Sequence, residues 1–446
     1  MRFGRSTMSL DATLFNVSRP IQSLTALFVG WKAVLLAFAL GAVIGPDYDT
    51  STSLFFDRLY GNKTRVSPLA ASLTRWDALY FVQHARQGYV FEQQWAFGAA
   101  MPGLVRALVS LIPSWMADGN GVALEPLVAI ALAHLAHLTA VLALYRLTMI
   151  LSAERKLAFV ASALHIFSPA GIFLSAPYAE SPFAGLTFIG NVLFALSIKN
   201  RSDPLARSVL IVGAGIVFGL ATAFRSNGLG SGVLFAVSAV HGLAALARER
   251  TVANLMGLAA AGIGGLCVAA GSALPQFVAW KRYCDDALPE LGPRPWCSRT
   301  IPSIYTFVQE EYWNVGFLHY WRTSHIPLFF VAAPMLAVLI KSGVDTMRDP
   351  LRCLRLVPFG GGTGEDYRVF VRTLAATQTA VALLAITNYH VQIINRMSSG
   401  YPVWYWWVAR CLVDEKRQAW GRRIFVFIVM YAGIQGGLFA SFLPPA

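Results

Sequence analysis

The chain has 446 residues, of which 56% are hydrophobic and only 13% are charged, and its mean hydropathy is +0.54. This composition is too apolar for a set of soluble domains and indicates a protein that crosses a membrane several times. The formal net charge is +13, but Lys and Arg gather in short loops between apolar runs, a pattern that is typical of membrane orientation and argues against a nucleic-acid-binding face.

The first apolar run covers residues 20–44 and follows Arg2, Arg5 and Arg19. It is too long for the apolar core of a cleaved signal peptide and lacks a cleavage site of small residues. We therefore predict an uncleaved membrane span whose N-terminal end faces the cytosol.

Residues 45–121 contain no clean span and are predicted to form the first lumenal loop, with amphipathic helices at the membrane surface. Within this loop, residues 98–115 are apolar enough either to cross the membrane or to lie along it. The later basic loops favour the second interpretation, because only then do they all fall on the cytosolic side.

Five basic stretches set the orientation of the remaining chain: 152–156, 199–207, 247–250, 341–355 and 414–423. With all five in the cytosol, further spans are predicted at about 122–151, 158–176, 180–198, 208–224, 228–246, 252–279, 325–341, 369–388, 402–413 and 424–443. We therefore expect a single all-α membrane domain over residues 1–446 with about eleven transmembrane helices.

This orientation places the unusual polar stretches on one side of the membrane. Besides the first loop, they are "PYAESP" (177–182), "RSNG" (225–228), the loop around 281–322, and "HVQIINRMSSGYP" (390–402). Any one of these loops could simply be polar because it is a loop. Five of them on one side, rich in aromatic and acidic residues rather than in Gly, Ser and Lys, favour a functional face.

The stretch "RWDALYFVQHARQ" is predicted to be a helix with Asp77, Tyr80, His84 and Gln87 on one polar stripe. A carboxylate at this position, shielded by Trp76, is suited to take a proton from a substrate hydroxyl. The alternative is that Asp77 only caps the helix beside its neighbouring arginine.

Two further acids and one arginine could bind a substrate. Glu92, in "YVFEQQWAF", is either a ligand for sugar hydroxyls or a cation, or an ordinary surface glutamate. Glu180 lies at a predicted membrane boundary, where an ionised carboxylate is costly unless it is paired or functional. Arg225 lies at the matching depth, so the two either form a buried ion pair or use the guanidinium to clamp a lipid phosphate, and neither role excludes the other.

Cys284 and Cys297 lie in one predicted lumenal loop, residues 280–323, which favours a disulfide in an oxidising compartment. The neighbouring histidines do not give a compact zinc spacing, and we expect no metal site. Asn62, in "NKT", is the one sequon predicted to lie well inside the lumenal stretch and is the candidate for glycosylation.

Two other motifs are interpreted as structural. His134 and His137 lie on an apolar run at helical spacing and are predicted to be satisfied polar groups within the membrane rather than ligands. The glycine-rich stretch 359–366 resembles a phosphate-binding loop but lacks its Lys-Ser/Thr ending, so a flexible linker is expected.

These stretches resemble, in order along nearly the whole chain, the PIG-V family of endoplasmic-reticulum mannosyltransferases (GPI mannosyltransferase II). The resemblance rests on "RWDALYFVQHARQGYVFEQQWAF", "LSAPYAESPFAGLTFIGN", "AFRSNGLGSG", "CDDALPELGPRPWCSRTIPSIYTFVQEEYWNVGFLHYW" and "HVQIINRMSSGYPVWYWW". The tract "WCSRTIPSIYTFVQEEYWNVGF" is specific, whereas a Trp-Asp pair in the first loop is shared by many lipid-sugar-dependent transferases.

The resemblance implies a glycosyltransferase of the GT-C type that adds an α1,6-linked second mannose to a glycosylphosphatidylinositol (GPI) precursor in the lumen of the endoplasmic reticulum. It also implies dolichyl phosphate mannose as donor, a precursor carrying one mannose as acceptor, no further cofactor and, as the fungal members suggest, a small membrane partner subunit. A β-linked donor and an α-linked product require an inverting displacement, with one base on the acceptor and positive charge near the departing phosphate.

We assign the role of base to Asp77 and that of the phosphate-binding cation to Arg225. The residues expected to contact the substrates or hold the arginine are Trp76, Tyr80, His84, Glu92, Tyr178, Glu180 and Asn227. Two other functions remain open. A dolichol-sugar-dependent transferase of N-glycan or protein glycosylation would share the Trp-Asp loop but not the 280–322 tract, and a lipid scramblase or transporter would need no lumenal base.

Overall fold

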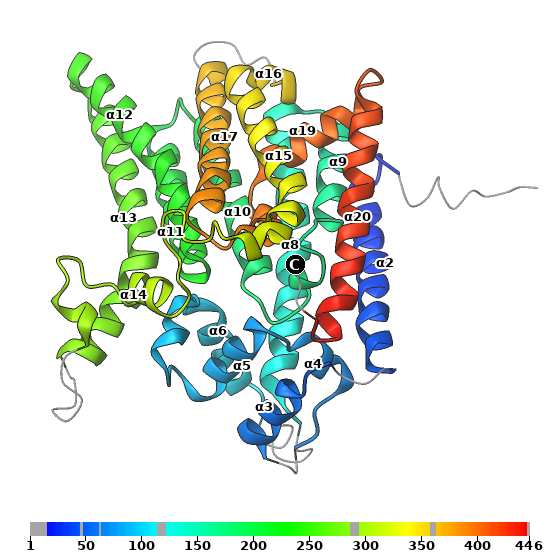
Figure 1. Cartoon of the computed structure of the whole chain (residues 1–446). Helices are drawn as coiled ribbons and strands as arrows, with labels where there is room; N and C mark the ends of the chain where they lie inside the picture. The colour runs from blue at the N-terminus through cyan, green and yellow to red at the C-terminus, as the bar shows by residue number, and fades with distance from the viewer. Residues whose placement is uncertain are drawn as a thin grey trace, which may run out of the picture.

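The computed structural model describes residues 16–44, 48–61, 64–113, 122–285, 294–356 and 363–443. These residues form helices joined by short loops, and within these ranges the only β-type pairing is an isolated bridge between Arg65 and Val122. The long helices stand side by side, and the short helices α3 to α6 and α14 gather at one end of the bundle (Figure 1). The expected all-α membrane fold is confirmed.

Nine helices in the described ranges are long and apolar enough to cross a bilayer, and they coincide with nine of the predicted spans. They are α2 (Pro20–Gly41), α8 (Leu124–Ser152), α10 (Glu180–Lys199), α11 (Pro204–Phe224), α12 (Gly232–Arg248), α13 (Val252–Trp280), α15 (Ile326–Arg348), α17 (Thr363–Thr387) and α20 (Gln418–Ala440). The predicted count of eleven is not confirmed.

The two remaining predicted spans, 158–176 and 402–413, correspond to α9 (Arg155–Ile166) and α19 (Pro402–Val413), each of 12 residues. At 1.5 Å per residue such a helix is about 18 Å long, which is too short for a hydrocarbon core of about 30 Å. Helix α9 stops before Pro169, because proline disfavours a helical conformation in the residue that precedes it. Both helices are largely buried and pack against each other inside the bundle.

The segment predicted to be the first lumenal loop forms short helices: α3 (Ser51–Tyr60), α4 (Pro68–Leu73), α5 (Asp77–Gln87), the 3₁₀ turn η2 (Glu92–Ala96) and α6 (Ala100–Ser110). Helix α6 covers most of the ambiguous stretch 98–115. Its 11 residues are too few to cross a bilayer, and it packs against α5 and α8. The stretch therefore does not add a span, as the loop charges predicted.

The other short elements frame the loops between the long helices. They are η1 (Ala42–Ile44), η3 (Gly171–Leu174), η4 (Ser226–Ser231), the π turn η5 (Lys281–Asp285), η6 (Pro295–Ser298), α14 (Ile304–Glu311), η7 (Thr323–His325), α16 (Pro350–Cys353), η8 (Val391–Ile393), α18 (Ile394–Met397) and η9 (Ser398–Gly400).

Helices α11 and α13 approach each other closely because glycines line their contact. A Cβ atom on Gly215 would collide with the backbone of Gly264, and one on Gly219 or Gly271 would collide with the backbone of the opposite helix. Small residues at such contacts let membrane helices pack backbone to backbone. The contact fixes α11, whose last residue precedes Arg225, against α13, which leads into the cysteine loop.

Candidate active site

A cavity of about 530 Å³ opens where the short helices of the first loop meet α10, α11, α14 and α18. Six of the predicted site residues line it: Asp77, Tyr80, Tyr178, Glu180, Arg225 and Asn227. Arg396 of α18 lines the same cavity. The fold therefore brings together stretches that lie more than 300 residues apart in the sequence.

The charged side chains of the cavity form one continuous network. Arg396 donates a hydrogen bond from Nη1 to Oδ2 of Asp77 at 3.0 Å, and its Nε lies 3.8 Å from Oε1 of Glu180. Arg225 donates to the same oxygen of Glu180 and, from Nε, to Oδ1 of Asn227 at 3.3 Å. Glu180 is therefore shared by two guanidinium groups, and one of them also binds Asp77.

Local structure explains where the two acids lie. Asp77 is the first residue of α5 and Glu180 is the first residue of α10. A carboxylate in the first turn of a helix is stabilised by the positive end of the helix dipole. Both carboxylates therefore lie at helix starts that line the cavity.

The four charged side chains of this network differ in how far they are exposed to the cavity and solvent. The exposed fraction of the side chain is 1% for Glu180, 16% for Arg225, 17% for Arg396 and 36% for Asp77. Glu180 is thus a buried anchor, whereas Asp77 is the acid that a substrate in the cavity can reach. Trp76, not Asp77, occupies the N-cap position of α5, with φ at 56°, so the capping role considered for Asp77 does not match the helix start.

Sequence reasoning missed Arg396. It lies in the stretch that the topology placed on the functional face, and it is a charged residue at a predicted membrane boundary, which is the signal that singled out Glu180 and Arg225. The aromatic rings of Phe173 and Tyr178 pack against this guanidinium, with its central carbon 4.7 Å and 5.4 Å from their ring centres. The rings hold the group between the two carboxylates.

The other side of the cavity is aromatic. Tyr80 stacks on Phe97 with ring centres 5.0 Å apart, and Trp313 meets Phe97 edge to face at 5.5 Å. Flat aromatic faces beside hydrogen-bonding groups suit a sugar ring. His390 also lines the cavity, and burial lowers the pKa of its imidazole, which therefore remains neutral at pH 7.

Three predicted site residues do not line this cavity. The ring of Trp76 stacks on Phe442 at 5.0 Å. His84 is buried against Tyr89, and burial together with the charge of Arg106 lowers the pKa of His84 to about 3. The helix over residues 77–87 is confirmed, but its polar stripe is not exposed along its whole length as expected, because the His84 side chain is buried against Tyr89.

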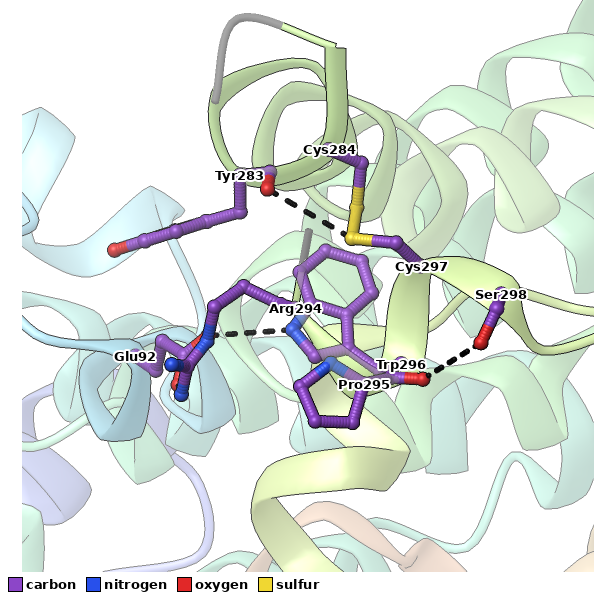
Figure 2. The surroundings of a disulfide bond; sticks show 8 residues. All are labelled: Glu92, Tyr283, Cys284, Arg294, Pro295, Trp296, Cys297 and Ser298. Atoms are coloured by element: carbon purple, nitrogen blue, oxygen red, sulfur yellow. Dashed lines mark hydrogen bonds and ion pairs between the residues drawn. A yellow bond between two sulfur atoms is a disulfide. The ribbon is translucent and has the colours of Figure 1, made fainter. Parts of the chain in front are cut away.

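Glu92 is the third of these residues, and it joins the first loop to the cysteine loop. Its carboxylate accepts hydrogen bonds from both Nε and Nη2 of Arg294, and further bonds from Trp296 at 3.3 Å and Tyr312 at 3.2 Å. Figure 2 shows Arg294 and Trp296 beside Glu92, and Trp296 directly precedes Cys297, which forms the disulfide with Cys284. We call the four residues Glu92, Arg294, Trp296 and Tyr312 the Glu92 latch.

The Glu92 latch holds the wall of the cavity. Helix α14 packs against η2, which begins at Glu92, and the residues of the α14 segment that line the cavity are Tyr305, Gln309, Trp313 and Val315. Because the disulfide closes the loop from which Arg294 projects, it keeps this segment beside the cavity.

We expect reduction of the disulfide to destabilise the protein, since closing a loop of this size contributes about 3 kcal/mol in the chain-entropy model. Thermal unfolding of the purified protein with and without dithiothreitol measures the effect, and Cys284→Ser should abolish the difference. The matched control is Cys267→Ser, which removes a thiol outside the bond. Finding both thiols free in protein alkylated before lysis would contradict the bond.

The remaining sequence motifs lie away from the cavity. In the part of the chain that the structure describes, no three His, Cys, Asp or Glu side chains are grouped to hold a metal ion. His134 bonds the carbonyl of Ile130 and His137 that of His165, as expected for polar groups within the membrane. Asn62 and residues 359–362 of the glycine-rich stretch lie outside the described residues.

Comparison with known proteins gives matches along nearly the whole chain. Residues 24–446 match the family model described as Mannosyltransferase (PIG-V). The chain is 57% identical to a protein of Gibberella zeae named GPI mannosyltransferase 2, over 96% of this chain and 98% of that one. Proteins with the same name from Aspergillus fumigatus and Schizosaccharomyces pombe are 39% and 31% identical, covering 99% and 85% of this chain and 97% and 74% of theirs.

Among solved structures, the chain is similar to the oligosaccharyltransferase of Archaeoglobus fulgidus in its apo form. The TM-score is 0.42 at 12% sequence identity, and the match covers 92% of this chain. The chain spans 57% of the length of that structure.

Proposed function

The chain belongs to the Mannosyltransferase (PIG-V) family, and from this membership we propose that it transfers mannose to a precursor of the GPI anchor in the endoplasmic-reticulum membrane. In finer terms, the proposed reaction adds the second mannose, in α1,6 linkage, from dolichyl phosphate mannose. The observation that carries the proposal is the cavity in which an accessible carboxylate, two guanidinium groups and an aromatic wall meet.

The chemistry assigned to the cavity is a single displacement with inversion. The acceptor hydroxyl oxygen attacks C1 of the donor mannose, the bond from C1 to the phosphate oxygen breaks, and dolichyl phosphate leaves with the electron pair. Asp77 takes the proton of the hydroxyl. Its bond to Arg396 fixes the orientation of the carboxylate, so Arg396 is a positioning residue for the base.

Arg225 is assigned to the donor phosphate. Its guanidinium lines the cavity, is anchored by Glu180 and Asn227, and presents planar donors of the kind that bind phosphate in pairs. Positive charge that is already in place stabilises the negative charge that develops on the departing phosphate. Tyr80 completes the proposed sugar-binding surface, which needs no cofactor other than the donor. Tyr178, predicted to contact the substrate, is almost fully buried and donates its hydroxyl to the carbonyl of Arg75, so its proposed role is to support Arg396.

We also propose that the reaction does not require a divalent metal. Asp77 and Glu180, the two carboxylates of the cavity that we place in the site, are both ion-paired with arginines, and the guanidinium groups supply the charge that a metal would provide. Transfer that is abolished by EDTA and restored by Mg²⁺ or Mn²⁺ would contradict this assignment.

The test of the function uses the purified full chain reconstituted in liposomes with radiolabelled dolichyl phosphate mannose. We expect label to enter a GPI precursor carrying one mannose, but not an unmannosylated precursor or a dolichol-linked oligosaccharide. Transfer to the oligosaccharide instead would favour the alternative transferase. A parallel reaction with co-purified membrane proteins tests whether a small partner subunit is needed for turnover.

The proposed lumenal position of the cavity gives a prediction about topology. A protease-cleavable tag inserted after Asp203, in the exposed turn between α10 and α11, should be cut from the cytosolic side of intact microsomes, because this turn carries basic residues. A glycan at Asn62 should be protected there and removable by endoglycosidase after solubilisation. Cleavage of the Asp203 tag only in opened microsomes would reverse the orientation.

A further inference from the structure

A second cavity, of about 190 Å³, lies between the ends of α10, α11, α12, α13 and α17. Its polar residues include Arg201, Arg207, His241 and Asp366, and the rest of its wall is largely apolar. None of these residues belongs to the active site described above.

This cavity lies at the opposite end of the bundle from the active site. Helix α10 begins at Glu180 in the active site, and its last turn, with Ser197 and Ile198, lines the second cavity. Helix α11 runs back from Arg207 to the residue before Arg225. At 1.5 Å per residue the two cavities are about 25 to 30 Å apart, which is the thickness of the hydrocarbon core. The second cavity therefore opens at the other surface of the membrane.

The charge of the second cavity suits an anion. Arg201 pairs with Asp366 at 2.8 Å, and both side chains are partly exposed. The Nε atom of Arg207 is buried and forms no hydrogen bond with any residue in the described ranges. Two guanidinium groups thus face one carboxylate. Nε of Arg207 is enclosed by protein, so the donors that a ligand could reach are the terminal nitrogens of its guanidinium.

The surroundings suit a lipid better than a free ion. Leu234 and Val237 of α12 and Ala253 of α13 line the same cavity as the charged groups, so its wall is apolar beside them. Helix α12 buries only a small part of its surface in the protein. An occupant with a charged head and apolar tails would therefore match both parts of this cavity.

We propose that the second cavity binds the phosphate of an anionic phospholipid from the leaflet opposite the active site. Arg207 and Arg201 contact the phosphate oxygens, and the acyl chains lie along α12 and α13. Basic pockets between membrane helices at the cytosolic surface bind anionic headgroups in this way. Free inorganic phosphate offers the same oxygens, and the experiment separates the two.

The test measures, by native mass spectrometry of the full chain in detergent, how much phosphatidylinositol is retained relative to phosphatidylcholine with the same acyl chains. We expect the wild-type protein to prefer phosphatidylinositol, and Arg207→Gln to reduce this preference about fivefold, with a larger loss when Arg201→Gln is added. The matched control is Arg248→Gln, at the same end of the bundle but outside the cavity, which should keep the preference.

A second variant fills the cavity without removing charge. Gly257 lines it, and a Cβ atom there would meet no atom within 4 Å, so Gly257→Leu should fold and exclude the lipid. Gly262→Leu, on the same helix and equally unobstructed, is the control. Phosphatidylinositol bound in the active-site cavity would still be retained by the Gly257→Leu variant, so this variant distinguishes the two cavities.

Three outcomes would overturn the proposal: equal retention of the two lipids by the wild-type protein, an unchanged preference in Gly257→Leu, or loss of phosphatidylinositol when millimolar inorganic phosphate is added. The last outcome would assign the cavity to free phosphate.

Discussion

Asp77→Asn should lower the rate of mannose transfer on the order of 10²–10⁴-fold, because the amide keeps the shape of the side chain but cannot accept the proton of the acceptor hydroxyl. The substitution should leave the fold intact, since Asn can still accept the hydrogen bond from Arg396, and Arg396 keeps Glu180 as a charged neighbour. Single-turnover transfer measured with saturating donor and acceptor isolates the chemical step.

The control for this prediction is Asp57→Asn. Asp57 is an exposed acid on α3 in the same first loop and is not among the residues that line the cavity, so its variant should transfer mannose at the wild-type rate. A folded Asp77→Asn protein with near wild-type turnover would remove Asp77 from the mechanism. Glu180 would then be the acid of the cavity to test, although its burial limits its contact with a substrate.

The parts of the molecule that could be predicted from the sequence are those in which a local pattern decides the structure. Long apolar runs with basic flanks gave nine helices close to their observed bounds, because a helix that spans the bilayer must satisfy its backbone internally. The same rule wrongly predicted membrane spans at 158–176 and 402–413. Helices α9 and α19 are apolar because protein surrounds them, and a short buried helix has the composition of a membrane span.

The active site was predictable only in part, for a related reason. Glu180 and Arg225 stood out because a charge at a membrane boundary must be compensated, and the structure pairs them. The sequence could not reveal that Arg396, more than 300 residues after Asp77, completes the network, since that contact depends on how distant helix ends meet. Glu92 carried no such signal, because a loop glutamate can simply face water, yet the structure buries it and pairs it with Arg294 of another loop. Charge identified residues that need partners, and it identified the partner only for Glu180 and Arg225, which lie at matching depth.

Arg225→Ala should weaken binding of the donor at least about tenfold, because a charge-assisted contact to the phosphate is lost. The defect should appear equally with a non-reactive dolichyl phosphate analogue, since the phosphate is bound before and during the reaction. Asp77→Asn should bind this analogue normally. The surface ion pair of Arg299 and Glu310 provides the control, and Arg299→Ala should leave analogue binding unchanged.

The structural role of Arg225 must be separated from this effect, because its removal leaves the buried carboxylate of Glu180 with only Arg396, at 3.8 Å. Arg225→Ala should therefore also lower the temperature of thermal unfolding, and adding Glu180→Gln should restore part of that loss by removing the uncompensated charge. If Arg225 binds the donor phosphate, the double variant regains stability while analogue binding stays weak. Recovery of analogue binding together with stability would instead make Arg225 a partner of Glu180 alone, and the phosphate would then have to be held by Arg396, whose guanidinium lines the same cavity.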